Sequence, residues 1–357
     1  MLKPNKRLPF PKRRLRCALW VGFIPSFVAM VLVCTIMVLM ALGKSALLQV
    51  DKDSLQTPSD VFDYADDENL VIYKGKRYTF NENVTSILCI GVDKEEFAGA
   101  KKDTSEKGQA DALFLISIDT VTGRTVILPI SRETMTEIAL YSNEGKALGS
   151  ATRQICMAYA YGDGKKTSCE NTVLSVSRLL YGIPINSYYA IDISAVAKLN
   201  DKLGGVTLTA LEDMQLETQR VKAGQSVTLK GKNALAYIQQ RGDDVNANNL
   251  RMQRQIQYLR AFSEKTLQRT RSDISTINKL YQTAAKYSVN NISLANIIYL
   301  AGCVMNNGTS LEFKSISGET RMGEEYVEFY PDATLLYETV LDIFYLEQQS
   351  HTASAAK

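Results

Sequence analysis

Three short apolar runs between Ser86 and Thr134 constrain the fold of this 357-residue chain more than any other feature. Each run has the length of a strand and carries a charged side chain at one end. Asp93 follows the first run, Asp111 precedes the second and Arg132 follows the third. Two carboxylates and one guanidinium at strand ends suit a site that binds phosphate together with a divalent cation. We therefore expect a sheet with a charged site at one edge.

Each of these residues also has a purely structural explanation. An aspartate after a glycine, such as Asp93, commonly caps a turn, and Asp111 can do the same. Arg132 can form a surface ion pair with Glu133 or Glu137. The functional interpretation therefore requires that the three side chains meet in space.

A second polar cluster lies between Tyr237 and Gln255, in the run YIQQRGDDVNANNLRMQRQ. Arg241 ends one predicted helix, and Arg251 and Gln255 lie four residues apart on one face of the next. The first turn of a helix also offers free N–H groups to an anion. A solvated basic face is the alternative interpretation. An anionic substrate held with a metal ion needs both signs of charge, which the two clusters together supply.

The N-terminus predicts a membrane anchor. Residues 17–43 hold no charged side chain, and this is longer than the roughly 20 residues needed to span a bilayer. The positive-inside rule places residues 1–16 in the cytoplasm and the bulk of the chain outside the cell membrane, as a single-pass signal anchor. A cleaved signal peptide is the alternative. Seven basic side chains precede the apolar run: Lys3, Lys6, Arg7, Lys12, Arg13, Arg14 and Arg16.

Charge and histidine content exclude some classes of function. Without the seven basic residues of the N-terminal arm, the chain has 34 Lys and Arg against 38 Asp and Glu. No nucleic-acid partner is therefore expected. The single histidine, His351, lies in the C-terminal tail, which excludes zinc sites built on several histidines and a histidine general base in the core.

Two of the six cysteines, Cys156 and Cys169, flank a polar loop. An extracytoplasmic location permits a disulfide between them. Two partly buried free thiols are the alternative.

Predicted strands and helices alternate in mixed order, which indicates an α/β fold. We expect an α-β-α sandwich-like arrangement, with a central mixed β-sheet flanked by helices. Residues 44–82 form a predicted juxtamembrane linker with a hairpin, residues 83–346 the main domain and residues 347–357 a flexible tail. The predicted helices cover residues 169–180, 193–203, 231–241, 250–269, 273–286, 293–305 and 332–346, and the predicted strands cover residues 86–91, 112–119, 125–130, 187–192, 206–210, 226–229, 311–316 and 326–330.

Three apolar segments, residues 173–180, 193–203 and 293–304, can form core or can wall a long apolar slot. A membrane tether makes a lipid-linked substrate physically reasonable, because it confines the protein and the lipid to one thin layer.

The order of motifs between Ser86 and Phe262 resembles that of the LytR-CpsA-Psr proteins. The motifs are GVD, a Gly-x-x-Asp before an apolar strand, SIDTVTGRTVILPISRET, AYAYG, LLYGIPINSYYAIDISAVAKLNDKLGGVTL, LKGKNALAYIQQR and LRMQRQ. The resemblance implies a phosphotransferase that moves a glycopolymer, such as teichoic acid or capsule, from a polyprenyl-pyrophosphate carrier to peptidoglycan. It also implies Mg²⁺ (or Mn²⁺) as cofactor and an apolar groove for the lipid.

The resemblance assigns roles to particular residues. Asp93 and Asp111 match the family's acidic pair and are the implied metal ligands, which act with Arg132 in catalysis. Arg132, Arg241, Arg251 and Gln255 are the implied pyrophosphate-binding residues.

Three positions depart from the family pattern. Gln109 and Gln239 stand where the family carries arginines, and Asn248 stands where it carries an aspartate. The loss of these charges keeps a second function open, that of a non-catalytic polyprenyl-phosphate-binding sensor or scaffold in cell-envelope assembly.

Overall fold

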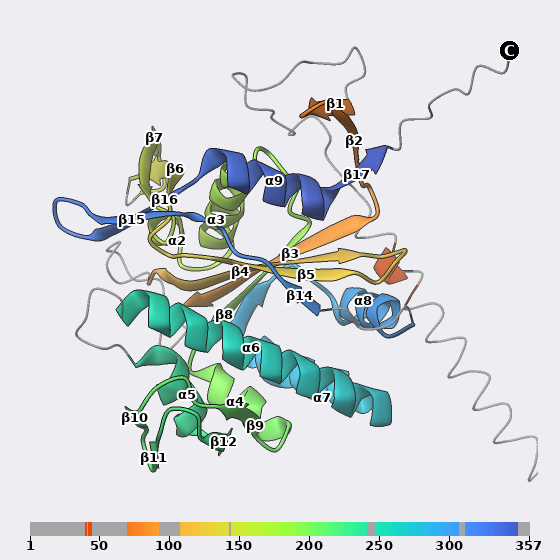
Figure 1. The fold of residues 1–357 in the computed structure, drawn as a ribbon, viewed down its shortest axis with the longest axis vertical. Coiled ribbons are helices and arrows are strands. Elements are labelled where there is room, and N and C mark those ends of the chain that lie inside the picture. Colours follow the sequence, from red (N-terminus) through yellow and green to blue (C-terminus); the bar gives the residue numbers. More distant parts are fainter. Residues whose placement is uncertain are drawn as a thin grey trace, which may run out of the picture.

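The computed structural model describes residues 40, 42–44, 70–92, 108–142, 144–240, 247–306 and 311–348. A six-stranded sheet lies at the centre of the described part of the chain (Figure 1). Its strands are β3 (Val84–Val92), β4 (Ala110–Asp119), β5 (Thr125–Ile130), β8 (Ser187–Asp192), β13 (Ser288–Asn290) and β14 (Leu311–Phe313). The order across the sheet is β13-β8-β3-β4-β5-β14. The predicted central mixed sheet is confirmed.

The three central strands form an antiparallel meander, and the outer strands make the sheet mixed. β3 pairs antiparallel with β4, and β4 pairs antiparallel with β5. β8 runs parallel to β3, and β14 runs parallel to β5. Every residue of β5 is buried, because helices cover both faces of the sheet.

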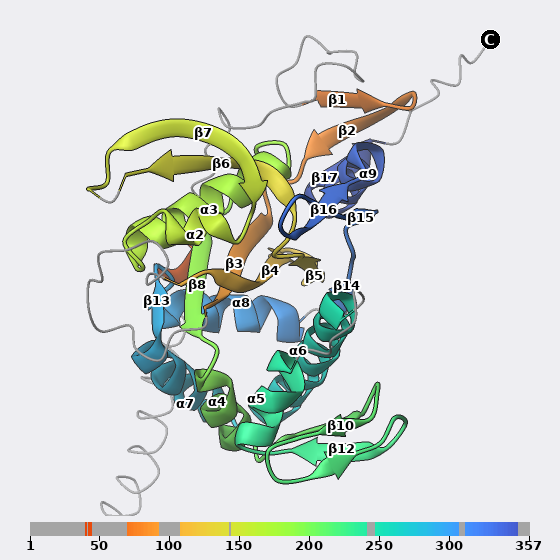
Figure 2. The ribbon, with the colours of Figure 1, turned by 90° about the vertical axis from the view of Figure 1, so that its left-hand side faces the viewer.

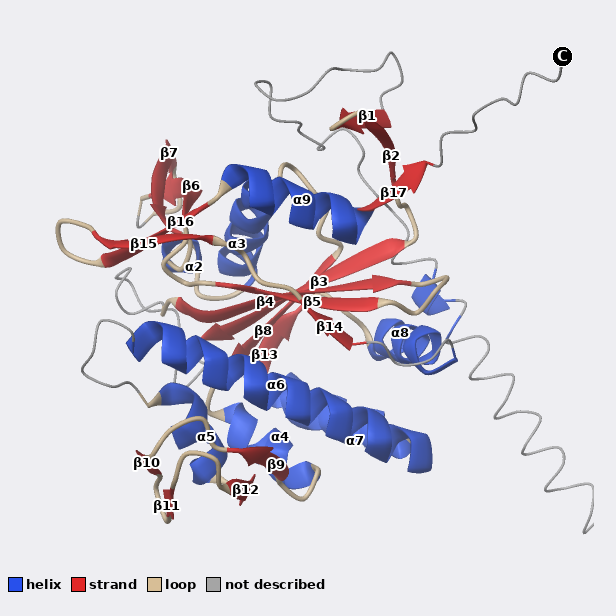
Figure 3. Ribbon diagram, in the orientation of Figure 1, coloured by secondary structure: helices blue, strands red, loops and turns tan. Residues whose placement is uncertain are grey.

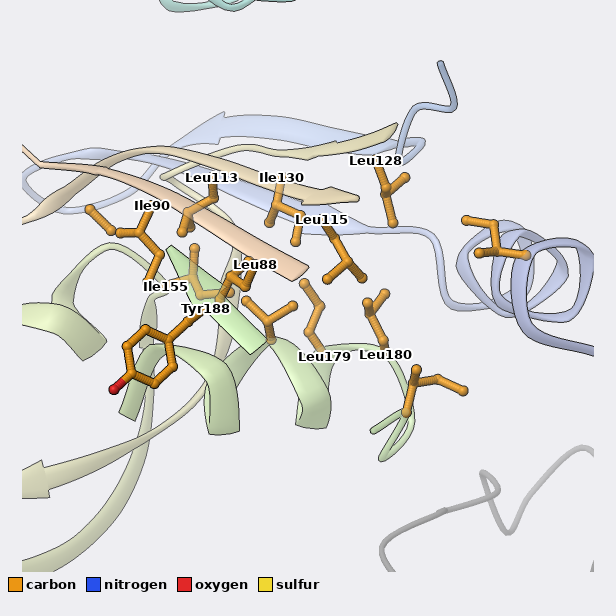
Figure 4. Packing of buried hydrophobic residues seen from close by; sticks show 14 of the residues in the cluster. Leu88, Ile90, Leu113, Leu115, Leu128, Ile130, Ile155, Leu179, Leu180 and Tyr188 are labelled. Carbon is orange, nitrogen blue, oxygen red and sulfur yellow. The ribbon is translucent and has the colours of Figure 1, made fainter. Parts of the chain in front are cut away.

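Helices pack on both faces of the sheet (Figure 3). α3 (Lys166–Leu179) and α9 (Ala333–Phe344) cover one face, and α6 (Ala247–Ser272) and α8 (Leu294–Asn306) lie on the other. The period-two alternation of the strands sorts the side chains between these layers. Leu88 and Ile90 pack toward α3 in the main core, as Figure 4 shows, whereas Ile87 faces α8.

A small lobe packs against the first half of α6 (Figure 2). It consists of α4 (Ala195–Lys202), β9 (Val206–Thr209), β10 (Met214–Gln215), β11 (Arg220–Val221), β12 (Ser226–Leu229) and α5 (Lys232–Gln239). Val206, Leu229 and Tyr237 form its buried centre together with Tyr258 of α6. α7 (Ser275–Ala284) and a short 3-10 turn (Ala285–Tyr287) then lead into β13.

Several elements lie where the sequence analysis expects none. β6 (Met135–Tyr141) and β7 (Ala147–Gln154) form a hairpin, followed by α2 (Met157–Ala160). β15 (Gly318–Met322) is also unpredicted, and it pairs with β16 (Val327–Pro331), which matches the strand predicted at residues 326–330. β7 and β15 are almost wholly exposed. Strands with little buried surface lack the apolar alternation from which strands are predicted.

The end of the chain corrects a predicted boundary. The helix predicted to reach residue 346 ends at Phe344, and β17 (Tyr345–Gln348) follows it. β17 pairs with β2 (Lys76–Phe80) of the predicted hairpin, whose other strand is β1 (Leu70–Tyr73). This pairing satisfies backbone groups that the hairpin otherwise leaves at an open edge. The first two residues of the predicted tail therefore belong to a sheet.

The predicted membrane segment, residues 17–43, lies outside the described residues except for Met40, Leu42 and Gly43, which are helical. Within the part of the chain that the structure describes, none of the helices has both the length and the apolar character that a membrane span requires.

Candidate functional site

Asp111 and Arg132 meet at the edge between β4 and β5. Leu113 of β4 pairs with Ile130 of β5 in antiparallel register. Asp111, two positions before Leu113, therefore lies opposite Arg132, two positions after Ile130. Arg132 Nη1 donates a hydrogen bond to Asp111 Oδ1, and the two side chains are 18% and 19% exposed. The structure thus brings together the acid and the arginine that the strand ends predicted.

Two further side chains hold the guanidinium of Arg132. Its Nη2 donates to Gln109 Oε1 at 2.6 Å and lies 3.8 Å from Cys156 Sγ. Burial alone lowers the pKa of Arg132, but the Cys156 sulfur and the Asp111 carboxylate outweigh this effect and raise the pKa above its ordinary value. Arg132 is therefore a fixed, permanently charged group.

The first turns of α6 complete the charged site. Arg251 is 6% exposed, and Gln255 donates from Nε2 to the carbonyl oxygen of Ile238 at 3.2 Å. Arg251 and Gln255 line a small pocket of about 20 Å³ together with Asp111 and Arg132. Four of the six predicted site residues therefore share one pocket, which we call the charged pocket.

The other two predicted residues, Asp93 and Arg241, lie outside the described residues. β3 ends at Val92, which pairs with Ala110, the residue directly before Asp111. The description of α5 and its cap ends at Gln240, directly before Arg241.

Arg254 has a role that the sequence analysis did not assign. Its side chain is 2% exposed, and its Nη groups donate to the carbonyl oxygens of Tyr237 and Gln240. Its Nε lies 3.1 Å from Glu212 Oε1, an ion pair without hydrogen-bond geometry. Burial lowers the pKa of Arg254, and Glu212 partly offsets this effect. Arg254 fixes α6 to the end of α5, and the only sign of it in the sequence is the second arginine of LRMQRQ.

An apolar cavity of about 190 Å³ adjoins the charged pocket. The two share Ala112, Phe114 and Gln255 as lining residues. The remaining walls come from β3, β8, α4, α5, α6 and the turn before α4: Cys89, Ile90, Gly91, Ile191, Ile193, Val196, Leu199, Ile238, Gln239, Tyr258, Leu259 and Phe262. A charged group in the pocket and an apolar chain in the cavity can therefore belong to one bound molecule.

Small side chains on the sheet keep this cavity open. A Cβ atom added to Gly91 would lie 3.1 Å from the Ala112 Cβ and 3.2 Å from the Ile193 Cγ1. Burial raises the pKa of the Cys89 thiol to about 12, as expected beside an apolar space. Of the three predicted apolar helices, only the one beginning near Ile193 lines the cavity. The other two, residues 173–180 and 293–304, pack in the core.

The candidate disulfide is not formed. Cys156 and Cys169 are both free, buried thiols. The sulfur of Cys156 contacts Arg132 and Gln154, whereas Cys169 packs in the main core from the first turn of α3. Burial raises the pKa of both thiols, that of Cys169 to about 12. The expectation of a bridge is therefore corrected to two separate buried thiols.

The donor set fits a divalent cation that takes part of its coordination from the substrate. Among the residues that the structure describes, no three or more His, Cys, Asp or Glu side chains form a metal cluster. The charged pocket does offer the carboxylates of Asp111 and Glu133. Mg²⁺ is commonly held by one or two carboxylates, with phosphate oxygens and water as its other ligands. Asp111 fits this role.

Comparison with known proteins identifies the family. Residues 50–340, most of the chain, match the LytR_cpsA_psr family. The chain belongs to the LytR_cpsA_psr family. Among curated LytR_cpsA_psr relatives, it is 28% identical over 199 residues to the polyisoprenyl-teichoic acid–peptidoglycan teichoic acid transferase TagU of Bacillus licheniformis, which covers 56% of each chain.

Solved structures of the LytR_cpsA_psr family have the same fold. The crystal structure of B. subtilis TagV matches with a TM-score of 0.57 and 25% identity, over 73% of this chain and 95% of that one. A structure of TagT bound to LI-WTA matches with a TM-score of 0.54 and 21% identity, over 73% and 89%. The chain spans a little over half the length of the curated TagU relatives of B. licheniformis and B. subtilis.

Proposed function

We propose that this LytR_cpsA_psr protein is a membrane-anchored, extracytoplasmic phosphotransferase. It moves a glycopolymer from a polyprenyl-pyrophosphate carrier to peptidoglycan. One observation carries the proposal: the charged pocket, with Asp111, Arg132 and Arg251, opens onto the apolar cavity through Ala112, Phe114 and Gln255. A pyrophosphate with a polyprenyl tail has this combination of charge and apolar length. The names of the curated relatives, which are teichoic acid transferases, support the same class of reaction.

The arginines bind and orient the pyrophosphate. Arg132 is held by Asp111 and Gln109, so its position costs no reorganisation when charge develops on the phosphate. Arg251 approaches from the fifth residue of α6, directly after the first turn, whose free N–H groups also favour an anion. Both guanidiniums stabilise the negative charge that builds on the departing polyprenyl phosphate.

The transfer step exchanges a phosphoanhydride bond of the donor for a new phosphoester bond to the acceptor sugar. A hydroxyl oxygen of a peptidoglycan sugar attacks the sugar-side phosphorus, and the bond from that phosphorus to the bridging oxygen breaks. Polyprenyl monophosphate leaves with the bond electrons. The hydroxyl proton passes to a carboxylate, for which Asp93 is our choice, because the single histidine lies in the C-terminal tail.

A divalent cation, Mg²⁺ or Mn²⁺, is part of the proposal. Asp111 and Asp93 would hold it, and it would neutralise charge on the pyrophosphate oxygens. Asp111 therefore has two tasks, since it also orients Arg132.

A second candidate function is a sensor or scaffold that binds polyprenyl phosphate without turnover. The contacts of Arg132 favour it, because Nη1 is bonded to Asp111 and Nη2 to Gln109. Gln109 also carries no charge, where the family pattern has an arginine. Fewer donors and fewer charges then remain for a substrate phosphate.

One assay separates the two functions. The full-length protein is incubated with a lipid-pyrophosphate-linked oligosaccharide and wall fragments, with Mg²⁺ or with a chelator, and polyprenyl monophosphate is quantified by mass spectrometry. The enzyme releases polyprenyl monophosphate and labels the wall only when Mg²⁺ is present. A protein that retains the intact donor under both conditions is a binding protein, and the transfer proposal is then wrong.

A further inference from the structure

The end of the predicted membrane segment contacts the folded domain. Met40 and Leu42–Lys44 are helical and lie beside α8, as Figure 1 shows for the red segment. Asn296 Nδ2 donates to the carbonyl oxygen of Gly43 at 2.9 Å. Asn296 is 5% exposed, although amide side chains are mostly found on the surface. A buried polar side chain here therefore has a partner from more than 250 positions earlier in the chain.

The two segments approach too closely for larger side chains. A Cβ atom added to Gly43 would lie 2.5 Å from the carbonyl oxygen of Ala295 and 2.9 Å from the Tyr299 Cβ. A Cβ atom added to Gly302 would lie 3.0 Å from the Met40 Cε. Small residues therefore permit this helix contact from both sides, as they do where helices pack closely in membranes.

The side chain of Asn296 bonds to Ser293 and to Gly43 at the same time. Its Oδ1 accepts from the backbone N–H of Ser293 at 2.9 Å, and its own N–H donates to Ser293 Oγ at 3.2 Å. This reciprocal capping begins α8 and uses the acceptor of the amide. The donor of the same amide is left for Gly43. The start of α8 is thereby built to receive the helix end at Gly43.

A row of apolar side chains on β4 connects the apolar cavity with α8. On this face of β4, Ala112 and Phe114 line the cavity, and Ile116 and Ile118 continue in the same row toward α8. Ile118 is seven residues from Asp111, roughly 23 Å at about 3.3 Å per residue. Ile116 and Ile118 pack with Leu300 and Val304 of α8. The apolar surface therefore runs from the charged pocket to α8, which contacts Met40 and Gly43.

We propose that α8 is the docking surface for the described end of the membrane anchor, Met40, Leu42 and Gly43. The contact fixes the domain with α8 toward the bilayer, so the lipid tail and the anchor leave the domain at the same end. The direction of the tail rests on the proposed function, whereas the docking itself does not. A flexible tether from residue 44 would let the domain tumble, and the cavity would then meet the bilayer only part of the time.

Site-specific photo-crosslinking in the full-length, membrane-embedded protein tests the docking. A diazirine amino acid is placed at position 40, which faces Gly302, or at position 42, whose native Leu42 is 58% exposed and serves as the matched control. Cross-linked peptides are mapped by mass spectrometry. Position 40 labels the peptide that contains α8, and position 42 labels it at least about fivefold less.

Two substitutions then break the contact in different ways. Gly43→Val places side-chain atoms against Ala295, and Asn296→Asp keeps the Ser293 capping acceptor but removes the donor to Gly43. Each lowers the cross-link from position 40 by roughly fivefold or more, and thermal unfolding of the domain changes little for Gly43→Val. Equal labelling from positions 40 and 42, or labelling unchanged by Gly43→Val, overturns the proposal. The readout needs no lipid turnover, so its failure is distinct from failure of the proposed function.

Discussion

Arg132 Nη1 donates a hydrogen bond to Asp111 Oδ1 across the edge between β4 and β5. The two residues stand 21 positions apart in the sequence, and the antiparallel meander brings them together. The pair holds a guanidinium at the opening of an apolar cavity before any anion arrives.

Arg132→Lys should reduce the rate of glycopolymer transfer by on the order of 10²-fold. A lysine keeps the charge but lacks the planar fork, so it cannot contact Asp111, Gln109 and a phosphate together. Arg153→Lys, on the exposed strand β7, is the control and should leave the rate unchanged. Equal rates for the Arg132 and Arg153 variants would show that the guanidinium geometry of Arg132 is not used.

Gln109→Glu should weaken the binding of polyprenyl pyrophosphate by roughly tenfold, measured as a Kd in detergent. The carboxylate keeps an acceptor for Arg132 Nη2 but cancels part of the positive charge that attracts the anion. Gln109→Ala removes the hydrogen bond without adding charge and should weaken binding less, by about fivefold at most. Tighter binding by the glutamate variant would mean that Gln109 does not face the ligand's charge.

Arg254→Met should lower the free energy of unfolding by about 3 kcal/mol, measured by urea denaturation. The substitution leaves the carbonyl oxygens of Tyr237 and Gln240 without their donor and Glu212 without its partner. Arg269→Met, at an exposed position of the same helix, should change stability by less than about 0.5 kcal/mol. Similar losses in the two variants would refute the structural role of Arg254.

Stability should fall as the pH rises above about 9. Burial raises the pKa of Cys169 to about 12 from 9.0, so between these values only the unfolded chain releases the thiol proton. Ionisation then favours unfolding by up to about 1.4 kcal/mol per pH unit, whereas below pH 9 the thiol is protonated in both states and has no such effect. Urea midpoints across this range should fall less steeply for Cys169→Ala. If the urea midpoints of both proteins fell equally steeply with pH, the raised pKa of Cys169 would not contribute to the loss of stability.

The sequence predicts the elements whose apolar side chains recur at a regular period and are buried in the fold. β3, β4 and β5 alternate or bury all their side chains, and their ends place Asp111 and Arg132. β7 could not be predicted, because its side chains are mostly exposed and carry no apolar period. β17 forms where β2 offers a free edge, a property of the partner strand rather than of residues 345–348.

The site was predictable in composition but not in detail. Charges at strand ends and at the start of α6 indicated Asp111, Arg132, Arg251 and Gln255, which share the charged pocket. Nothing in the sequence separates Arg254, which is buried for structural reasons, from Arg251 three residues earlier. The contact between Gln109 and Arg132 also depends on the fold. From the sequence, Gln109 shows only that a charge of the family pattern is missing.

The most direct test of the central claim measures the affinity of the full-length protein for prenyl pyrophosphates of increasing tail length. If one ligand spans the charged pocket and the apolar cavity, affinity rises with tail length until the cavity is filled. Cys89→Phe, which fills the cavity, abolishes this dependence, whereas Cys89→Ala preserves it. Affinity that does not depend on tail length in the native protein, or that is unaffected by Cys89→Phe, would contradict the account.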